Sequence, residues 1–459
     1  MICPDSLMSG SKDMREKEFL PSVASSLGIG SLNTMQRRML DVASESRDVV
    51  LLSPTGSGKT LAFILPVLKL LRPSTGRIQV VVIAPSRELV LQISDIIRKV
   101  GAGVRCVAVY GGHSVEDETN SLRVTPDILV GTPGRLLDHA NRGNMDLRPV
   151  RICVLDEFDK SLELGFEKDM ARIFGKLKNV SRILLTSATP LPGELPDFLK
   201  LNNPLTLSYL KDNKDLKKRL KVYSVTSDST DKLDSLYSLL ASLAGDGKLD
   251  KTMVFVNHRE SAERVASYLK RRGVSAVLYH GALDQRDREK ALALFRNGSR
   301  NVLVCTDLAA RGLDIHGVEH VIHYHQPLTA EAYTHRNGRT ARVDAEGSAY
   351  LLLGPDEQPA GFVELTGSYR PVSHGAAALG TGRESLYIGA GRKDKLSKGD
   401  ILGWLTKDLG IPGSEVGAID LADRYSLVTV PTDTARDIAA AANSHKIKGQ
   451  KRLVRLITD

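Results

Sequence analysis

The feature that most constrains this chain is a glycine-rich loop placed between an apolar run and a helical pattern. The apolar run is Val49–Leu52 and the helical pattern covers Leu61–Leu71. Glycines let backbone N–H groups curl around a phosphate at a helix N-terminus, where the helix dipole favours negative charge. The pattern therefore predicts a phosphate-binding loop made of Ser53, Pro54, Thr55, Gly56, Ser57, Gly58, Lys59 and Thr60.

Two residues of this loop have expected roles. Lys59 should reach the β- and γ-phosphates of a nucleotide, and the hydroxyl of Thr60 should hold Mg²⁺. The strict pattern begins with glycine, whereas this loop begins with Ser53, a small residue that can also make the turn. A glycine-rich turn that binds no nucleotide is the alternative, and the flanking strand and helix favour the nucleotide site.

A second half of such a site is expected where two acids follow another apolar run. Arg151–Leu155 leads directly into Asp156 and Glu157. At the carboxyl end of a strand, Asp156 can hold the water shell of the metal, while Glu157 can orient or deprotonate the attacking water. Adjacent acids at a strand end are often only a solvated loop, so it is their pairing with the phosphate loop that indicates a nucleoside triphosphatase.

Short apolar runs alternate with amphipathic segments from Ser31 to about Asn203, and the same rhythm restarts at Thr252. This alternation predicts an α/β fold with two tandem parallel sheets, each covered by helices on both faces. The expected strands besides those above are Val80–Ala84, Ile128–Val130, Ile183–Thr186, Thr252–Val256, Ala276–Leu278, Val302–Cys305, Val321–Tyr324 and Tyr350–Leu353, with a further helix at Glu88–Val100.

The last part of the chain has a different order of elements. Residues 385–459 follow the order β-α-β-β-α-β, which is typical of a ferredoxin-like or RRM-like α+β domain. Lys211–Lys221 is typical of a solvated linker, and Thr366–Gly382, rich in Gly, Ala and Ser, of a flexible one. We therefore expect domains at residues 1–207, 208–365 and 383–459, with a linker at 366–382.

Composition narrows the class of protein without deciding it. The chain has 459 residues and a formal net charge of +9, which favours polyanionic partners but is also found in basic proteins that bind no nucleic acid. Its four cysteines show no CxxC spacing, as suits a reducing compartment. Because we find neither a signal-peptide h-region nor an apolar stretch of about 18 residues, we expect a cytoplasmic protein with no membrane association.

With the phosphate loop and the acids in place, the chain resembles the DEAD-box RNA helicases along nearly its whole length. The acidic motif reads Asp156-Glu157-Phe158-Asp159, with Phe158 where the family usually has Ala. Gly28-Ile29 followed by Gln36, with Phe19 seventeen residues before it, is similar to the family's adenine-reading motif. That motif departs from the family pattern at Leu32-Asn33-Thr34, where the family usually has Pro-Thr-Pro.

The resemblance implies two RecA-like domains with further motif residues in each. In the first domain it implies RNA contacts by Arg87, Gly112, Thr132 and Arg135, and coupling of hydrolysis to RNA strain by Asp159, Ser187 and Thr189. In the second it implies RNA contacts by Gln285, Arg288 and Thr306, a ribose contact by Asp314, coupling by His335, and arginine fingers at Arg339 and Arg342. ATP and Mg²⁺ are the implied cofactors.

The terminal segment is similar to the last domain of the DbpA-type helicases, which bind a hairpin of 23S ribosomal RNA and act in large-subunit assembly. The match implies RNA binding by Tyr387, Arg392, Lys393, Lys395, Lys446 and Lys448. Base-stacking aromatics are scarce there: Tyr387 and Tyr425 are candidates, while Trp404 lies on an apolar helix face and is expected in the core.

The resulting prediction is a monomeric, RNA-stimulated ATPase that separates or strains short RNA duplexes in the assembling large ribosomal subunit. Two alternatives stay open. One is a general messenger-RNA or cold-response remodeller whose terminal domain anchors without specificity. The other is an ATP-gated RNA clamp that closes without separating strands, an alternative that Phe158 and the altered adenine-reading motif keep open.

Overall fold

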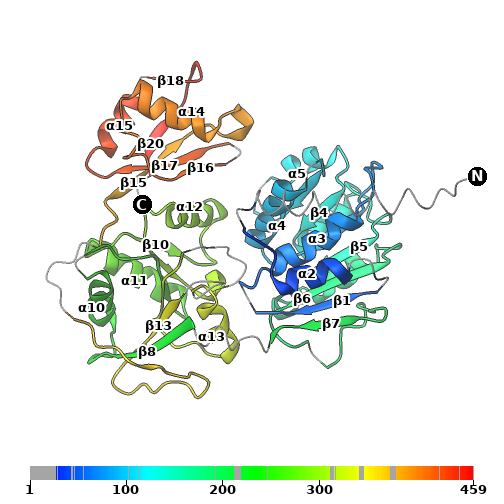
Figure 1. Cartoon of the computed structure of the whole chain (residues 1–459), viewed down its shortest axis with the longest axis horizontal. Helices are drawn as coiled ribbons and strands as arrows, with labels where there is room; N and C mark the ends of the chain where they lie inside the picture. The colour runs from blue at the N-terminus through cyan, green and yellow to red at the C-terminus, as the bar shows by residue number, and fades with distance from the viewer. Residues whose placement is uncertain are drawn as a thin grey trace, which may run out of the picture. The chain divides into compact units, whose positions relative to one another are not determined.

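The computed structural model describes residues 27 to 457, apart from 28, 43–44, 46, 55, 102, 113, 192, 211–218, 246, 311–314, 316, 341–345, 373–378, 423 and 444. The chain falls into two compact units (Figure 1). The first comprises residues 1–215 with 312–314, and the second comprises residues 216–311 with 315–459. The second unit contains both the second parallel sheet and the terminal domain.

The first unit is built on a seven-stranded parallel sheet in the order β3-β4-β2-β5-β6-β1-β7. Its strands are short and mostly buried, as parallel strands covered on both faces should be. They are β1 Val49–Leu52, β2 Val80–Ile83, β3 Cys106–Val109, β4 Ile128–Gly131, β5 Ile152–Leu155, β6 Arg182–Ser187 and β7 Leu205–Ser208.

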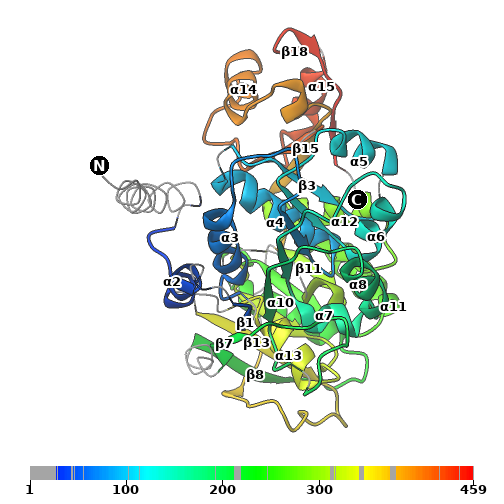
Figure 2. The ribbon, with the colours of Figure 1, turned by 90° about the vertical axis from the view of Figure 1, so that its right-hand side faces the viewer.

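Helices cover both faces of this sheet (Figure 2). One apolar cluster joins alternate strand residues to α2 Thr34–Asp41, α3 Lys59–Leu70 and α4 Arg87–Val100. The residues between them join a second cluster with α6 Pro133–Asn141, α7 Phe158–Glu163 and α8 Glu167–Phe174. Helix α5, Val115–Leu122, completes the unit. The period of two along each strand therefore divides the side chains between two cores.

The second unit begins with a sheet of the same kind, in the order β10-β11-β9-β12-β13-β8-β14. Its strands are β8 Leu220–Thr226, β9 Thr252–Phe255, β10 Ala276–Tyr279, β11 Val302–Cys305, β12 His320–His323, β13 Gly347–Leu353 and β14 Gly367–Ser368. Its helices are α10 Leu233–Ala244, α11 Arg259–Arg271, α12 Gln285–Arg296, the 3₁₀ turn Asp307–Ala310 and α13 Ala330–Asn337. The predicted pair of parallel sheets is confirmed.

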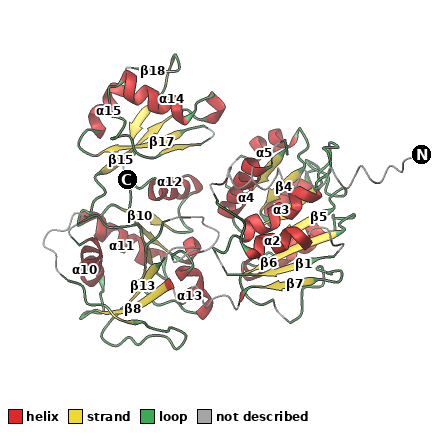
Figure 3. Cartoon of the chain, in the orientation of Figure 1, coloured by secondary structure: helices red, strands yellow, loops and turns green. Residues whose placement is uncertain are grey.

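The terminal domain is a four-stranded antiparallel sheet in the order β16-β17-β15-β20, with helices packed on it (Figure 3). The first and last strands are neighbours, which confirms the RRM-like arrangement. Trp404 is 4% exposed in this core, as predicted. The elements are β15 Arg383–Ile388, a turn Arg392–Asp394, α14 Lys398–Gly403, a π turn Trp404–Asp408, β16 Ile419–Leu421, β17 Ser426–Pro431, α15 Ala435–Ala442, the hairpin β18 Lys446–Ile447 and β19 Gln450–Lys451, and β20 Val454–Leu456.

Two segments were expected to be linkers, but the residues that the structure describes in each of them are partly in strands. Leu220 and Lys221 begin β8, which pairs in parallel with β13. Gly367–Ser368 pairs with β8, and Leu379 is 3% exposed in the core of the second sheet. The described ends of both segments are thus held by backbone pairing, and Leu379 and Tyr369 pack on the core of the second sheet.

The described part of the chain contains no helix long and apolar enough to span a membrane.

Candidate nucleotide site and nucleic-acid interface

Parallel strands bring their carboxyl ends to one edge of a sheet, which is where α/β proteins bind ligands. In the first unit this edge carries the phosphate loop after β1, the acids after β5 and the Ser187 segment after β6. The three strands are adjacent, in the order β5-β6-β1. The topology thus brings the phosphate loop next to two segments that follow it in the sequence by about a hundred residues or more.

The phosphate loop is held by its own backbone and by α2. Lys59 is 7% exposed and donates to the carbonyls of Ser53 at 2.5 Å and Pro54 at 3.0 Å, so its ammonium closes the loop. Gly58 has φ 87°, and a Cβ there would lie 2.5 Å from Nε2 of Gln36. The left-handed backbone conformation therefore favours glycine at this position, and a larger residue would also displace the amide end of Gln36.

Gln36, predicted to read adenine, contacts the phosphate loop together with Asn33, a residue to which the sequence analysis assigned no role. Gln36 is 7% exposed, and its Nε2 donates to the carbonyl of Gly58 at 3.3 Å. Asn33 caps α2 in a reciprocal pair of hydrogen bonds with Gln36, and its Nδ2 donates to the carbonyl of Ser57 at 3.0 Å. The signal was present, because Asn followed three residues later by Gln is a capping-box pattern.

Asp156 is a buried carboxylate suited to a cation. It is 2% exposed, accepts a hydrogen bond from Thr186 Oγ1, and lies close enough to Lys59 to feel its charge. Burial raises the pKa of Asp156, and the hydroxyl of Thr186 and Lys59 oppose that rise. A desolvated carboxylate gains most from a nearby cation, so Asp156 fits the predicted Mg²⁺ ligand.

Glu157 stands in a strained conformation beside it. Its φ is 48°, which is uncommon for a residue other than glycine, and its N–H donates to Thr186 Oγ1 at 3.2 Å. Such strain costs about 1–3 kcal/mol and concentrates at functional sites. Here it coincides with the residue predicted to activate water.

The rest of the acidic motif connects to β6. Asp159 Oδ2 accepts from Thr189 Oγ1 at 3.0 Å and from the N–H of Ala188 at 3.3 Å. Ser187 Oγ donates to the carbonyl of Thr189 at 2.6 Å. Phe158 is fully buried in the second core of the sheet. The exchange of the family's Ala for Phe is thus accommodated by packing behind the motif, with Asp159 bonded to the residues that follow β6.

The residues of the first unit that are predicted to contact RNA follow β2, β3 and β4, at the same carboxyl edge of the sheet. Gly111 lies beside Arg87, since a Cβ at this position would lie 3.4 Å from Nη2 of the arginine. Arg135 pairs with the buried Glu118 at 3.0 Å and donates to the carbonyl of Tyr110 at 3.3 Å. These contacts join the ends of β2, β3 and β4, where Gly112 and Thr132 also lie. The predicted group is therefore brought together on three neighbouring strands.

In the second unit, a buried arginine connects the segments at the carboxyl edge of the parallel sheet. Arg336 is fully buried and bonds both oxygens of Asp307, the carbonyl of His325 at 2.8 Å and Oδ1 of Asn257 at 2.8 Å. It thereby ties α13 to the ends of β9, β11 and β12. The sequence analysis assigned Arg336 no role.

Three of the predicted residues adjoin Arg336 or its partner Asp307, and two others lie on α12. His335 and Arg339 are 2% and 4% exposed, and the N–H of Arg339 donates to the carbonyl of Arg336 at 3.2 Å. Thr306 follows β11 directly, next to Asp307. Gln285 and Arg288 begin α12, and Arg288 donates to Oε1 of Gln285 at 2.7 Å.

In the terminal domain, the predicted basic residues gather on two loops. We call the basic rim the five exposed residues that were predicted, together with the exposed Lys451, which was not: Arg392, Lys393, Lys395, Lys446, Lys448 and Lys451. Lys448 Nζ donates to the carbonyl of Lys395 at 2.7 Å, which joins the β18–β19 hairpin to the Arg392–Asp394 turn. Tyr387 lies apart from the rim, on β15.

Comparison with known proteins agrees with this arrangement. Models of three families match: DEAD/DEAH box helicase over residues 33–197, helicase conserved C-terminal domain over 231–344, and DbpA RNA binding domain over 385–456. The ATP-dependent RNA helicase DbpA of Escherichia coli is 32% identical over 442 residues, which cover 94% of this chain and 95% of that protein. The chain belongs to the DEAD-box ATP-dependent RNA helicases.

Other similar proteins support the assignment of this chain to the DEAD-box helicases. The helicase RhpA of Helicobacter pylori is 36% identical over 352 residues, 75% of this chain and 70% of that protein. Among solved structures, Saccharomyces cerevisiae Dbp5 bound to RNA and ADP BeF3 has 26% identity and a TM-score of 0.65 over 73% of this chain and 87% of that one. Mss116 bound to single-stranded RNA has 26% identity and a TM-score of 0.68 over 78% and 80%.

Four of the predicted site residues of this helicase lie outside the described residues. They are Phe19, Thr55, Asp314 and Arg342. Their roles stay predictions.

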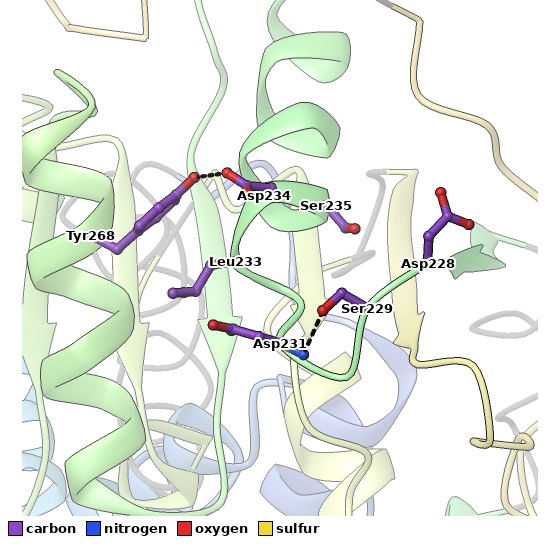
Figure 4. A pocket seen from close by; sticks show the side chains of 7 residues that line it. All are labelled: Asp228, Ser229, Asp231, Leu233, Asp234, Ser235 and Tyr268. Atoms are coloured by element: carbon purple, nitrogen blue, oxygen red, sulfur yellow. Dashed lines mark hydrogen bonds between the residues drawn. The ribbon is translucent and has the colours of Figure 1, made fainter.

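One hollow of the helicase takes no part in these sites. It has a volume of about 390 Å³ and is lined by Asp228, Ser229, Asp231, Leu233, Asp234, Ser235 and Tyr268 (Figure 4). Tyr268 donates to Asp234, and Ser229 Oγ accepts from the N–H of Asp231. Because it contains none of the motif residues and its three acids would repel phosphates, we assign it no role in ATP or RNA binding.

Proposed function

We propose that this DEAD-box helicase uses ATP and Mg²⁺ to strain or separate short duplexes next to a hairpin of 23S ribosomal RNA during assembly of the large subunit. We propose that it works in the cytoplasm as a monomer. The observation that carries the proposal is the terminal domain, whose basic rim lies within the match to the DbpA RNA binding domain.

The chemistry follows from the groups at the first edge. Lys59 and the loop backbone hold the β- and γ-phosphates, Thr60 and Asp156 hold Mg²⁺, and Glu157 orients the attacking water. The Mg²⁺ neutralises charge on the phosphates when bound. Phosphoryl transfer needs little covalent help from a protein, so positioning and charge are what these residues contribute.

The second unit would supply further positive charge to the γ-phosphate. Arg339 and Arg342 act as arginine fingers on the γ-phosphate, a device worth about 10³–10⁵ in rate. If RNA favours the closed arrangement, hydrolysis depends on RNA. Disrupting a few stacked steps costs about 5 kcal/mol at ~1.4 kcal/mol each, which ATP-linked closure can supply.

The test is selective binding by the full chain. A hairpin from the peptidyl-transferase region of 23S rRNA and a scrambled hairpin of equal length are titrated under the same salt, because phosphate contacts alone are strongly salt-dependent. We expect tighter binding of the ribosomal hairpin and stimulation of the ATPase at lower RNA concentration. Equal affinity for the two hairpins would refute the ribosomal assignment and leave a general RNA remodeller.

Matched variants locate the contact. Lys393→Ala with Lys395→Ala removes two charges from the basic rim, whereas Lys407→Ala removes an exposed lysine elsewhere in the same domain. We expect the rim variant to lose affinity for the ribosomal hairpin and the control to keep it. A rim variant that binds like the parent would show that the hairpin binds elsewhere.

A further inference from the structure

A buried carboxylate lies between two segments of the first unit that are predicted to contact RNA. It belongs to Glu118, which is 2% exposed in α5. Its Oε1 accepts a hydrogen bond from the N–H of Tyr110 at 2.7 Å, and its Oε2 lies 3.0 Å from Nε of Arg135. Tyr110 directly follows β3, and Arg135 lies in the first turn of α6, which follows β4. One side chain from a third element therefore joins the segments after both strands.

The same two segments hold residues with predicted RNA contacts. Gly112 lies two residues after Tyr110, and Thr132 is the N-cap of α6. β3 and β4 pair in parallel, and the N–H of Thr132 donates to the carbonyl of Val109 at 3.2 Å, so the two segments leave the sheet side by side. A shift of Tyr110 or of Arg135 would therefore move backbone groups that are proposed to contact RNA.

A histidine holds the carboxylate from the other side. His139 of α6 is fully buried, and its Nε2 lies 2.7 Å from Oε2 of Glu118. Its tautomer follows from Asn144, whose Nδ2 lies 3.2 Å from Oγ1 of Thr119 and 2.9 Å from Nδ1 of His139. The hydroxyl of Thr119 donates to the carbonyl of Val115 at 2.9 Å, so this hydroxyl accepts from Asn144. The second N–H of the amide therefore donates to Nδ1, which places the ring proton on Nε2 as the donor to Glu118.

The hydrogen bonds also give the RNA segments a fixed orientation. Hydrogen bonds depend on angle as well as distance, and those to a charged group are about twice as strong as neutral ones. Nε of Arg135 donates to the carbonyl of Tyr110 at 3.3 Å as well as facing Glu118. The guanidinium is thus turned toward the protein at Nε, and it connects the same two segments as the carboxylate does.

Stability of the fold does not account for a carboxylate at this position. Replacing a buried ion pair with apolar side chains of similar volume is often neutral or stabilising, because burial removes the hydration of the charges. The donors to Glu118 described above come from the segment after β3 and from α6, whereas the ATP site follows β1, β5 and β6. The carboxylate is therefore placed to order RNA contacts and lies on other strands than the ATP site.

We propose that Glu118 is a positioning residue for RNA binding, which fixes the segments after β3 and β4 through Tyr110 and Arg135. His139 keeps the carboxylate turned toward them. The inference rests on the RNA contacts proposed for these two segments and not on the ribosomal target.

Substitutions of Glu118 test the proposal in the full chain. Glu118→Met fills a similar volume without hydrogen bonds, whereas Glu118→Gln keeps one acceptor oxygen. The assay is steady-state ATPase titrated with purified bacterial ribosomal RNA, a probe that suits both the ribosomal assignment and a general RNA remodeller. We expect the RNA concentration for half-maximal stimulation to rise about tenfold in Glu118→Met, which corresponds to ~1.4 kcal/mol, and by less in Glu118→Gln. The KM for ATP and the rate at saturating RNA should match those of the parent.

Asp48→Asn is the matched control for loss of a buried carboxylate. Asp48 is 3% exposed and accepts from the N–H groups of Ile183 at 2.6 Å and Asn202 at 2.5 Å. It directly precedes β1, at the amino edge of the sheet. We expect Asp48→Asn to lower the Tm and to keep the parent's RNA concentration for half-maximal stimulation. A rise in Asp48→Asn equal to that in Glu118→Met would show a merely structural effect and overturn the proposal.

His139→Phe covers the case in which Glu118→Met does not fold. It removes the donor from the ring to Glu118 and leaves the pairing with Arg135, so the RNA concentration for half-maximal stimulation should rise by less than in Glu118→Met. The proposal is overturned if every folded variant of Glu118 and His139 keeps the parent's value.

Thr132→Ala separates two ways in which the proposal can fail. If Thr132→Ala keeps the parent's RNA concentration for half-maximal stimulation, the RNA contact at the start of α6 is wrong, and the positioning role falls with it. If Thr132→Ala raises this concentration and Glu118→Met does not, only the positioning role is wrong. Neither result concerns the ribosomal assignment, which the hairpin titration tests separately.

Discussion

Asn33 provides a sharp test of how the phosphate loop is held. It makes two separate contributions: its Oδ1 caps α2 by accepting from the N–H of Gln36 at 2.9 Å, and its Nδ2 donates to the carbonyl of Ser57 at 3.0 Å. Loss of an N-cap costs about 1 kcal/mol. Loss of one such hydrogen bond costs about 1 kcal/mol more.

Two substitutions separate these contributions. Asn33→Ser keeps a capping oxygen but loses the donor to Ser57, whereas Asn33→Ala loses both. Without these hydrogen bonds, the loop must be ordered when ATP binds, and the free energy of this ordering lowers the affinity for ATP. We expect the Kd for ATP to rise about fivefold in Asn33→Ser and up to about thirtyfold in Asn33→Ala, as ~1.4 kcal/mol corresponds to tenfold.

The assay is equilibrium titration of a fluorescent ATP analogue, with Ser397→Ala as the matched control. Ser397 caps α14 in the terminal domain by the same kind of hydrogen bond and lies far from the loop in the sequence. The control should lose a cap without losing ATP affinity. Equal ATP affinity in the parent and Asn33→Ala would refute the argument that α2 orders the loop.

Three further predictions concern the other groups. Glu157→Gln should bind ATP and RNA like the parent but lose about 10²–10⁴ in hydrolysis rate, measured by single turnover; hydrolysis at the parent rate would show that another group activates the water. Arg336→Lys keeps a charge but cannot repeat the forked contacts to Asp307, His325 and Asn257, so RNA-stimulated kcat should fall on the order of 10²-fold through misplacement of Arg339 while the Kd for ATP stays the same; an unchanged kcat would contradict this positioning role. Burial lowers the pKa of His323 to about 3, so between about 3 and the ordinary value of 6.5 the unfolded chain binds a proton that the folded chain does not, and stability rises with pH across that window; the fall in Tm from pH 7.5 to pH 5 should be smaller in His323→Gln than in the parent, and equal falls would show that His323 is not the group responsible.

Much of the fold could be predicted because the strands are buried runs with clear ends. Val49–Leu52 and Val302–Cys305 match their predicted bounds. The strands that escaped prediction, such as Cys106–Val109 and Leu220–Thr226, are only partly buried, with two fully buried residues each. A half-exposed strand has too few apolar residues to stand out from a loop, and β8 also follows a Lys- and Asp-rich stretch.

The residues of the candidate site likewise include some that the sequence predicts and others that it does not. Motif residues such as Lys59 and Asp156 could be assigned because their spacing reflects the chemistry of phosphate and metal binding. Asn33 and Arg336 act through other residues, so their roles become visible only with the contacts. Tyr387 shows the reverse case: an aromatic on an RRM-like strand predicts base stacking, but the neighbour that covers it comes from another domain.

The central claim is that RNA controls hydrolysis by bringing Arg339 to a phosphate held at Lys59. The most direct measurement is the steady-state ATPase rate with and without RNA, for the parent and for Arg339→Ala. We expect RNA to raise the parent's rate strongly, and Arg339→Ala to lose most of that rate while still binding ATP. A parent rate that is the same with and without RNA, or an Arg339→Ala variant that RNA stimulates as fully as the parent, would contradict the account.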